Sequence, residues 1–268
     1  MEPHVSLMQD ILSVISGSLV GFVLGLVGGG GSIIAVPLLV YVVGIGSPHL
    51  AIGTSAIAVS LSAASNLFNH ARKGMVKWPC AFSFSAAGVA GAWAGSTLAM
   101  RVPGDQLLAL FGLVMIAVGA VMAFRKDAEG NPDIRLNFST ARQLLPLLLL
   151  IGFGVGAASG FFGIGGGFLI VPGLMLATGM PINYAIGTSL VAVTIFGATT
   201  AANYALAGLI DWRIAAFFVG GGAIGGLIGT LASQRLGQKK GTLAIVFAGF
   251  VVLIGLYIAA KGLIGINA

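Results

Sequence analysis

The same glycine-rich motif occurs twice in this chain, and this duplication constrains the fold more strongly than any other feature of the sequence. Residues 28–37 read GGGGSIIAVP, and residues 163–172 read GIGGGFLIVP. The segment AIGTS at residues 51–55 recurs 134 positions later, at residues 185–189. We therefore divide the chain into a first repeat over residues 1–124, a linker over residues 125–142 and a second repeat over residues 143–268.

The composition places both repeats in a membrane. Of the 268 residues, 57% are hydrophobic and only 7% are charged, and the mean hydropathy is +1.06. A soluble protein of this length could not bury so much apolar surface. The apolar runs are continuous and do not alternate with polar residues, which favours helices over a β-barrel. The net charge of +6 is spread over the loops, so we interpret it as an orientation signal and expect no nucleic-acid binding.

Ten apolar segments are predicted to be membrane helices, five in each repeat. They cover residues 11–27, 33–46, 50–70, 79–100 and 105–124, and then residues 143–162, 168–180, 184–206, 213–234 and 241–261. The second segment of each repeat reaches only about 20 Å as a helix, whereas the bilayer core is about 30 Å thick. We therefore expect a half-helix, a re-entrant piece or a kinked span after each glycine-rich break.

The charged loops predict that the two repeats are inverted. In the first repeat the positive loop, Arg72–Lys77, follows the third segment. In the second repeat the positive loop, Arg235–Lys240, comes one connection later. Positive loops stay in the cytoplasm, so equivalent loops of the two repeats should lie on opposite faces of the membrane. Five crossings per repeat then place the linker inside and both termini outside.

Inverted repeats with broken helices form a substrate site at their interface in many secondary transporters. A break inside the membrane frees backbone amides, and amides at a helix start suit an anion. Close helix packing with a hinge is the alternative role for such glycines. The candidates for this part of the site are Gly29, Gly30, Gly31, Ser32, Gly165, Gly166 and Gly167. The motif is not a P-loop, because no Gly-Lys-Ser/Thr follows it.

Polar residues of the third segments complete the candidate site: Thr54, Ser55, Asn69, Thr188, Ser189 and Asn203. The hydroxyls can cap a helix or donate to a ligand oxygen, and duplication alone does not decide between these roles. For the two asparagines we favour hydrogen bonds between helices. His70 is matched by Tyr204, so this pair breaks the symmetry. It could line the path or couple it to a proton, and a histidine at headgroup level is the favoured alternative.

Acidic residues are absent from the apolar segments, because Asp10, Asp105 and Asp211 all fall at segment ends. Coupling through a buried carboxylate is therefore poorly supported, while sodium binding by carbonyls and hydroxyls stays open. The sequence offers no cluster for a metal or a cofactor. The residues around Ser159 are similar to the pattern of intramembrane serine proteases. None of the three histidines lies in the second repeat, so we expect no enzyme and keep a serine hydrolase as a remote alternative.

The duplicated motifs resemble those of a known family. The stretch GLVGGGGS at residues 25–32, the following Pro37, the AIGTS segment and their second copies are similar to the sulfite exporter TauE/SafE family of membrane transporters. The resemblance extends from about Val14 to Leu263. It implies transport of sulfur-containing anions, such as sulfite, sulfoacetate or other organosulfonates, across a bacterial or archaeal inner membrane.

We therefore predict an all-α polytopic membrane protein with two inverted repeats. It is expected to export a small sulfur-containing anion by alternating access at the interface of the repeats. Uptake of an organosulfonate or another small anion is the alternative. The expected partners are the anion and the lipid bilayer. Because Gly167 occupies the position of Ser32, the site should be nearly, but not fully, symmetric.

Overall fold

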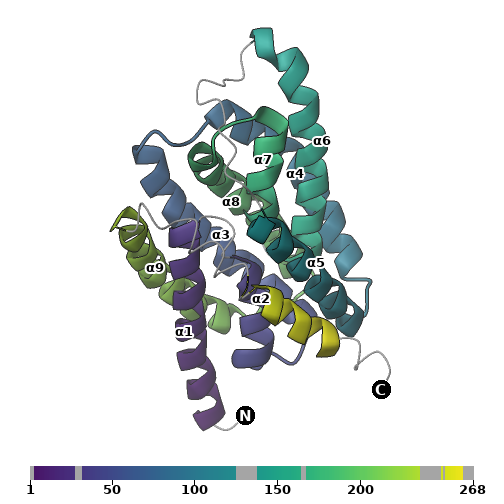
Figure 1. Cartoon of the computed structure of the whole chain (residues 1–268). Coiled ribbons are helices and arrows are strands. Elements are labelled where there is room, and N and C mark those ends of the chain that lie inside the picture. Colours follow the sequence, from purple (N-terminus) through teal and green to yellow (C-terminus); the bar gives the residue numbers. More distant parts are fainter. Residues whose placement is uncertain are drawn as a thin grey trace.

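A computed structural model of the protein describes residues 3–27, 32–124, 138–163, 167–235, 249 and 251–261. These residues are almost entirely helical and contain no β-strand (Figure 1). The first half contains α1 (Pro3–Val27), α2 (Ala35–Pro37), the π-helix η2 (Leu38–Val42), α3 (Pro48–Arg72), α4 (Trp78–Ala99) and α5 (Gly104–Phe124). The second half contains α6 (Phe138–Phe162), α7 (Gly167–Thr178), α8 (Ile182–Leu206), α9 (Trp212–Arg235) and the helical residues 251–261. The all-α prediction is confirmed for these residues, and α6 begins inside the predicted linker.

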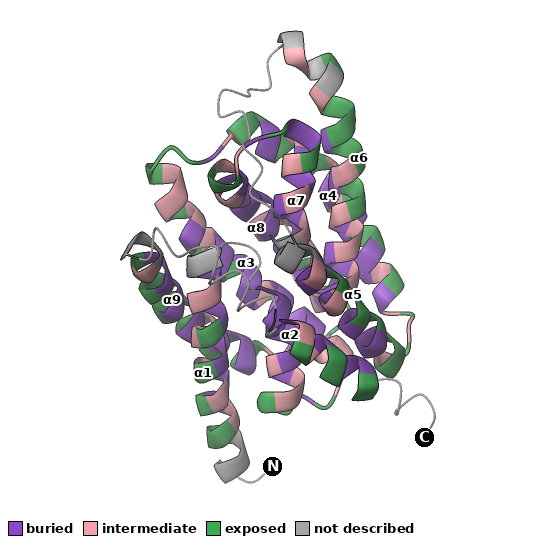
Figure 2. Cartoon of the chain, viewed as in Figure 1, coloured by how far each residue is buried: buried purple, intermediate pink, exposed green. Residues whose placement is uncertain are grey.

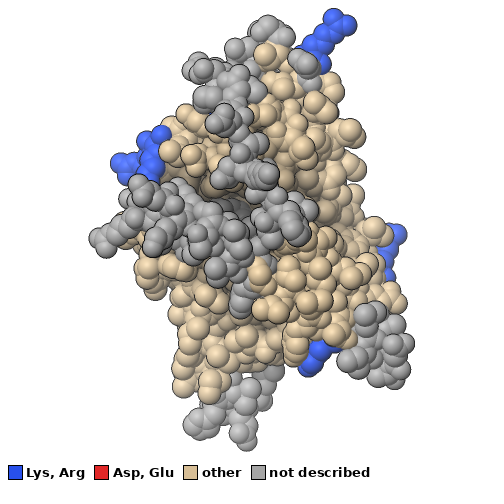
Figure 3. Space-filling model, in the orientation of Figure 1, with Lys and Arg blue, Asp and Glu red and all other residues tan. Residues whose placement is uncertain are grey.

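Within the described ranges, five helices, α1, α3, α6, α8 and α9, are long and apolar enough to cross a membrane. Large apolar side chains cover the outside of the molecule, and Leu150, Leu176 and Leu206 are 72%, 77% and 80% exposed. Among the described residues on the face shown in Figure 3, Lys and Arg side chains stand at the edges and the rest of the surface is uncharged. Such a surface is unfavourable in water and is compatible with lipid. The chain is therefore an α-helical membrane protein, as its composition predicted.

The second segment of each repeat is short, as predicted. Residues 32–42 and α7, which has 12 residues, would extend only about 16 to 18 Å as regular helices. Each contains the proline that ends the duplicated motif, Pro37 or Pro172. Pro37 cannot donate a backbone hydrogen bond, and the five residues after it form η2. Neither piece reaches the length of an ordinary membrane span.

The outer helices pack in two equivalent pairs, each made of one helix from each half. The helices α1 and α9 run parallel, and α4 and α6 also run parallel. A Cβ atom at Gly225 of α9 would collide with the carbonyl group of Ser18 on α1. A Cβ atom at Gly91 of α4 would collide with the carbonyl group of Phe153 on α6, which is the equivalent contact with the halves exchanged. The glycines thus allow the backbones to approach closely.

The helices α3 and α8 lie between these pairs and are antiparallel. The hydroxyl of Ser60 donates to the carbonyl oxygen of Thr194 at 2.7 Å, and these two residues occupy equivalent positions in the repeats. Two turns before Ser60, Gly53 near the start of α3 packs against Tyr204 near the end of α8. The start of one helix therefore meets the end of the other. Both helices are 67% buried along their spans, against 28% for α6 and 39% for α1 (Figure 2). They form the centre of the molecule.

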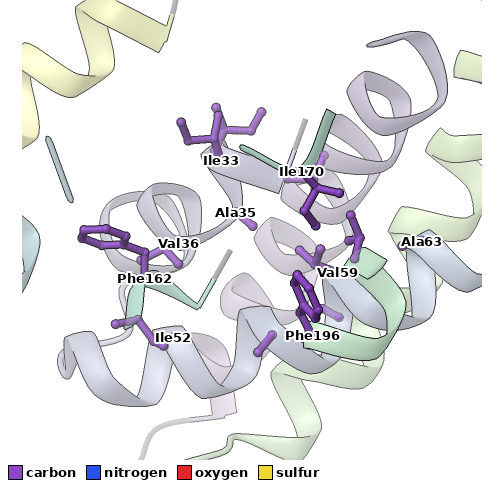
Figure 4. Close-up of a cluster of buried hydrophobic side chains, with 14 of the residues drawn as sticks. Ile33, Ala35, Val36, Ile52, Val59, Ala63, Phe162, Ile170 and Phe196 are labelled. Atoms are coloured by element: carbon purple, nitrogen blue, oxygen red, sulfur yellow. The ribbon is translucent and has the colours of Figure 1, made fainter. Parts of the chain in front are cut away.

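The repeat architecture is therefore interleaved. We call α1, α3 and α9 the first bundle, and α4, α6 and α8 the second bundle, because these helices contact one another. Each bundle contains one helix that belongs to the other half of the sequence. Between the bundles, buried apolar side chains gather around the short helices (Figure 4), among them Val36 and Ile52 of the first half and Phe162, Ile170 and Phe196 of the second.

The close approach of α1 and α9 makes a prediction about stability. Substitution G225A should destabilise the protein by about 1–3 kcal/mol, because the added methyl group must push α1 away from α9. The matched control is G220A on the same helix, where an added Cβ meets no described atom within 4 Å. The control should leave the melting temperature of the detergent-purified protein unchanged or slightly raised. Equal melting temperatures for the two variants would contradict the packing described here.

Candidate functional site

The structure describes the residues on either side of each glycine-rich break, but not the residues within the breaks. Gly29, Gly30, Gly31, Gly165 and Gly166 lie outside the described residues. Ser32 and Gly167, which follow the two breaks at equivalent positions, are both buried, and each begins a short helix. The Ser32 side chain therefore starts its helix inside the protein, and Gly167 offers only backbone at the corresponding place.

Ser55 of the first half holds the end of α6 in the second half. Its hydroxyl lies 2.9 Å from the carbonyl oxygen of Ile52 and 3.0 Å from that of Gly163, and these two acceptors share its single proton. Gly163 has a φ of +66°, which side chains rarely adopt, and an added Cβ would also collide with the Ile52 side chain. The second glycine-rich break therefore begins directly against the Gly-Thr-Ser motif of the other repeat. The equivalent Ser189 hydroxyl donates to Ile186 O at 2.8 Å.

Thr54 and Thr188 make equivalent contacts, each with the backbone of a loop from the other half of the chain. The Thr54 hydroxyl accepts from the backbone N–H of Asp211 at 3.0 Å, and the Thr188 hydroxyl accepts from that of Lys77, also at 3.0 Å. Both threonines are fully buried. Each therefore fastens the loop that precedes α9 or α4 onto the central helix of its bundle. Contact of these hydroxyls with a ligand stays a prediction.

Asn203 forms the interhelical hydrogen bonds that we favoured for it. Its side-chain amide donates to Ser96 Oγ at 2.7 Å and to Thr97 Oγ1 at 2.9 Å on α4. In the first half the corresponding bond is made one turn earlier by Asn66, whose Oδ1 accepts from Thr230 Oγ1 of α9 at 3.3 Å. Sequence comparison of the repeats missed Asn66, although Ser96 and Thr230 are equivalent positions. Asn69, which was singled out instead, is half-buried.

His70 and Tyr204 occupy different surroundings despite their equivalent positions. His70 is partly exposed, and its Nδ1 lies 3.1 Å from the carbonyl oxygen of Asn66. Tyr204 is completely buried against Gly53, and its hydroxyl has no hydrogen-bond partner among the described residues. The asymmetry expected from the sequence is therefore present as a difference in burial.

Charged side chains lie near the helix ends except for Asp10, which the sequence placed at a segment end and which is buried two turns inside α1. Asp10 of α1 forms an ion pair with Arg213 at the start of α9, with 2.6 Å between Asp10 Oδ2 and the guanidinium. Lys77 lies over the ring of Tyr184, 4.5 Å from its centroid. Within the described ranges, no three His, Cys, Asp or Glu side chains form a group that could hold a metal ion. Among the described residues, the buried polar groups near Gly163 are hydroxyls, amides and backbone groups, which are neutral hydrogen-bond donors and acceptors.

Ser159, the serine of the remote hydrolase alternative, is buried one turn before Gly163. Its hydroxyl has no hydrogen-bond partner in the part of the chain that the structure describes. The described histidine rings are engaged elsewhere, since His49 contacts the carbonyl groups of Ala99 and Val102 and His70 contacts that of Asn66. A nucleophilic serine needs a base within hydrogen-bond reach, and these contacts supply none.

Comparisons with known proteins identify the family of the chain. The sequence model of the sulfite exporter TauE/SafE family matches residues 13–258. A probable membrane transporter protein of Xylella fastidiosa (strain 9a5c) is 48% identical over 248 residues, which are 92% of this chain and 94% of the relative. The probable membrane transporter protein YunE of Bacillus subtilis is 25% identical over 96% of this chain and 99% of its own. No solved structure matches the chain. The chain is a membrane transporter and belongs to the sulfite exporter TauE/SafE family.

Proposed function

We propose that this protein exports a small sulfur-containing anion, such as sulfite, sulfoacetate or a related organosulfonate. The observation that carries the proposal is the junction of Ser55 with Gly163, where the Gly-Thr-Ser motif of one repeat meets the glycine-rich break of the other. The buried groups around this junction are neutral hydrogen-bond donors, which suit an anion whose charge is spread over several oxygens. The description of the matched family, sulfite exporter, supports the same class of substrate.

The candidate groups for the site are Gly29, Gly30, Gly31 and Ser32, Gly165, Gly166 and Gly167, and the side chains of Thr54, Ser55, Asn69, Thr188, Ser189 and Asn203. Gly53 packs against Tyr204 and Gly187 packs against Met75, so the two Gly-Thr-Ser motifs lie at opposite ends of the α3–α8 crossing. We centre the proposed site on the junction of Ser55 with Gly163. The hydrogen bonds of Ser55 to Gly163 and of Ser60 to Thr194 join one bundle to the other. Alternating access requires such contacts to break and re-form as the bundles rock, whereas the contacts of Thr54 and Thr188 stay within a bundle.

Export of an anion needs no coupling ion in a cell with a negative interior. The membrane potential supplies about 2.3 kcal/mol per charge per 100 mV. For a monovalent anion this energy corresponds to a concentration ratio of about fifty. The absence of a buried carboxylate near the junction, among the described residues, is consistent with transport driven in this way.

We place the protein in a bacterial or archaeal inner membrane with the two repeats inverted. The antiparallel α3 and α8 support this orientation, because equivalent membrane helices that run in opposite directions belong to inverted repeats. Lys77 and Asp211, at equivalent positions before α4 and α9, carry opposite charges. This difference agrees with a cytoplasmic first loop and an external second loop.

Efflux from proteoliposomes tests the proposed substrate and direction. The purified protein is reconstituted with sulfite, sulfoacetate, sulfate or acetate inside, and the initial efflux is measured at several imposed membrane potentials. We expect efflux of sulfite or the sulfonate that accelerates as the interior becomes more negative. Accumulation of a sulfonate from outside in place of efflux would favour the uptake alternative. Failure to move any sulfur oxyanion would contradict the proposal.

The double substitution T54V/T188V tests the duplicated hydroxyls. It should lower anion flux by about tenfold or more while the protein still inserts into the membrane, because a lost hydrogen bond to a buried group costs about 1–3 kcal/mol. The control is T199V, whose hydroxyl bonds to Ile195 O within its own helix. Unchanged flux in the double variant would exclude the two hydroxyls from the mechanism.

The inverted topology is tested with cysteines at equivalent loop positions. Cys80, the only cysteine, is buried and is first replaced by serine. K73C and A207C are then placed at two exposed positions that correspond to each other in the two repeats. A membrane-impermeant maleimide should label A207C in intact cells and K73C only after permeabilisation. Labelling of K73C from outside would overturn the inverted arrangement.

A further inference from the structure

Three hydroxyls on the second half are buried without a hydrogen-bond partner among the described residues. They belong to Ser159 of α6 and to Thr200 and Tyr204 of α8, and all three residues are completely buried. A serine or threonine inside a helix usually donates to the carbonyl group one turn earlier. Thr194 and Thr199 of the same helix do so, with distances of 2.7 and 2.8 Å. Thr200, beside Thr199, is an exception that requires an explanation.

The helix contacts bring these three hydroxyls to one region of the molecule. On α4, Gly88 packs against Phe196 of α8, and two turns later Ser96 binds Asn203 of α8. Midway between them, Ala92 of α4 packs against Gly160 of α6. Thr200 lies midway between Phe196 and Asn203, and Ser159 precedes Gly160. Ser159 and Thr200 are therefore at the same level of the second bundle.

The next turn of both helices reaches the proposed site. Gly163 is one turn beyond Ser159, where its carbonyl group accepts the hydrogen bond of Ser55. Tyr204 is one turn beyond Thr200, where it packs against Gly53. Tyr204 thus packs against the Gly-Thr-Ser motif of α3, and Ser159 and Thr200 lie one helical turn away from that level.

The first half has no equivalent group of hydroxyls. The positions that correspond to Ser159, Thr200 and Tyr204 hold Leu24, Asn66 and His70. Leu24 has no polar atom, and both Asn66 and His70 take part in hydrogen bonds. Ser16 and Ser85 of the first half also lack a described partner, but they do not correspond to these three positions. The group of Ser159, Thr200 and Tyr204 is therefore not a consequence of the duplication.

We propose that Ser159, Thr200 and Tyr204 donate hydrogen bonds to the oxygens of the transported anion. This inference rests on the proposed function and assigns the donors that recognise its substrate. A sulfite ion or a sulfonate group presents three oxygens on one sulfur, and three hydroxyls can donate to them without a positive charge. A carboxylate presents two oxygens and leaves one donor unsatisfied, so the site discriminates against it.

The test uses S159A, T200V and Y204F, each of which removes a hydroxyl with little change of shape. Each variant should raise the KM for sulfite efflux about ten- to a hundredfold, since hydrogen bonds to charged groups have this effect on affinity. Each should also melt at the wild-type temperature or above it, because the hydroxyl is unsatisfied without ligand. Protection of the wild-type protein against thermal unfolding by sulfite should be weakened in all three variants.

The control is S16A, which removes another buried hydroxyl without a described partner. Ser16 lies on α1, which packs against α9 and α3, so its loss should leave the KM unchanged. Wild-type KM values in S159A, T200V and Y204F would overturn this inference and leave the proposed function intact. A lower melting temperature with unchanged KM would assign the hydroxyls to folding. A wild-type protein that moves no sulfur oxyanion would overturn both proposals.

Discussion

The fold depends on close contact between helix backbones from opposite halves of the chain. Inside a bilayer, helices gain little from burying apolar side chains, because the lipid is equally apolar. Association must come from surfaces that fit closely. Glycines on α1 and α9, and at equivalent places on α4 and α6, remove the side chains that would keep these helices apart. The same contact occurs twice with the halves exchanged, so the two pairs fix the two-fold arrangement of the whole molecule.

This interleaving changes which parts of the protein can move as units. A division of the sequence at the linker suggests that one half rocks against the other. The contacts instead group α1 and α3 with α9, and α6 and α8 with α4. Any movement that separated the sequence halves would have to break both glycine-lined pairs. Movement between the mixed bundles affects two side-chain hydrogen bonds that join them: that of Ser60 to Thr194, where α3 crosses α8, and that of Ser55 to Gly163 at the end of α6.

Much of this architecture could be predicted from the sequence, because hydrophobic length and duplication are local patterns. The ten apolar segments, the short second segment of each repeat and the role of Asn203 in helix packing required only composition and spacing. The exchange of helices between bundles was not predictable in this way, since it depends on which surfaces meet. The Thr54 and Thr188 contacts were also missed. Their partners are backbone N–H groups of distant loops, and a backbone N–H group cannot be recognised from the residue type.

The pairing of α1 with α9 has a consequence for biosynthesis. Gly17 meets Phe218, a residue made about 200 positions later. Protein synthesis proceeds at about 5 to 20 residues per second, so α9 is made about 10 to 40 s after the glycine surface of α1. During that time α1 contacts lipid and helices made before α9, such as α3, with which its contact is smaller. Completion of the fold is therefore delayed until the ninth helix has been inserted, and a nascent chain stopped before Trp212 lacks the surface that its first helix is shaped to meet.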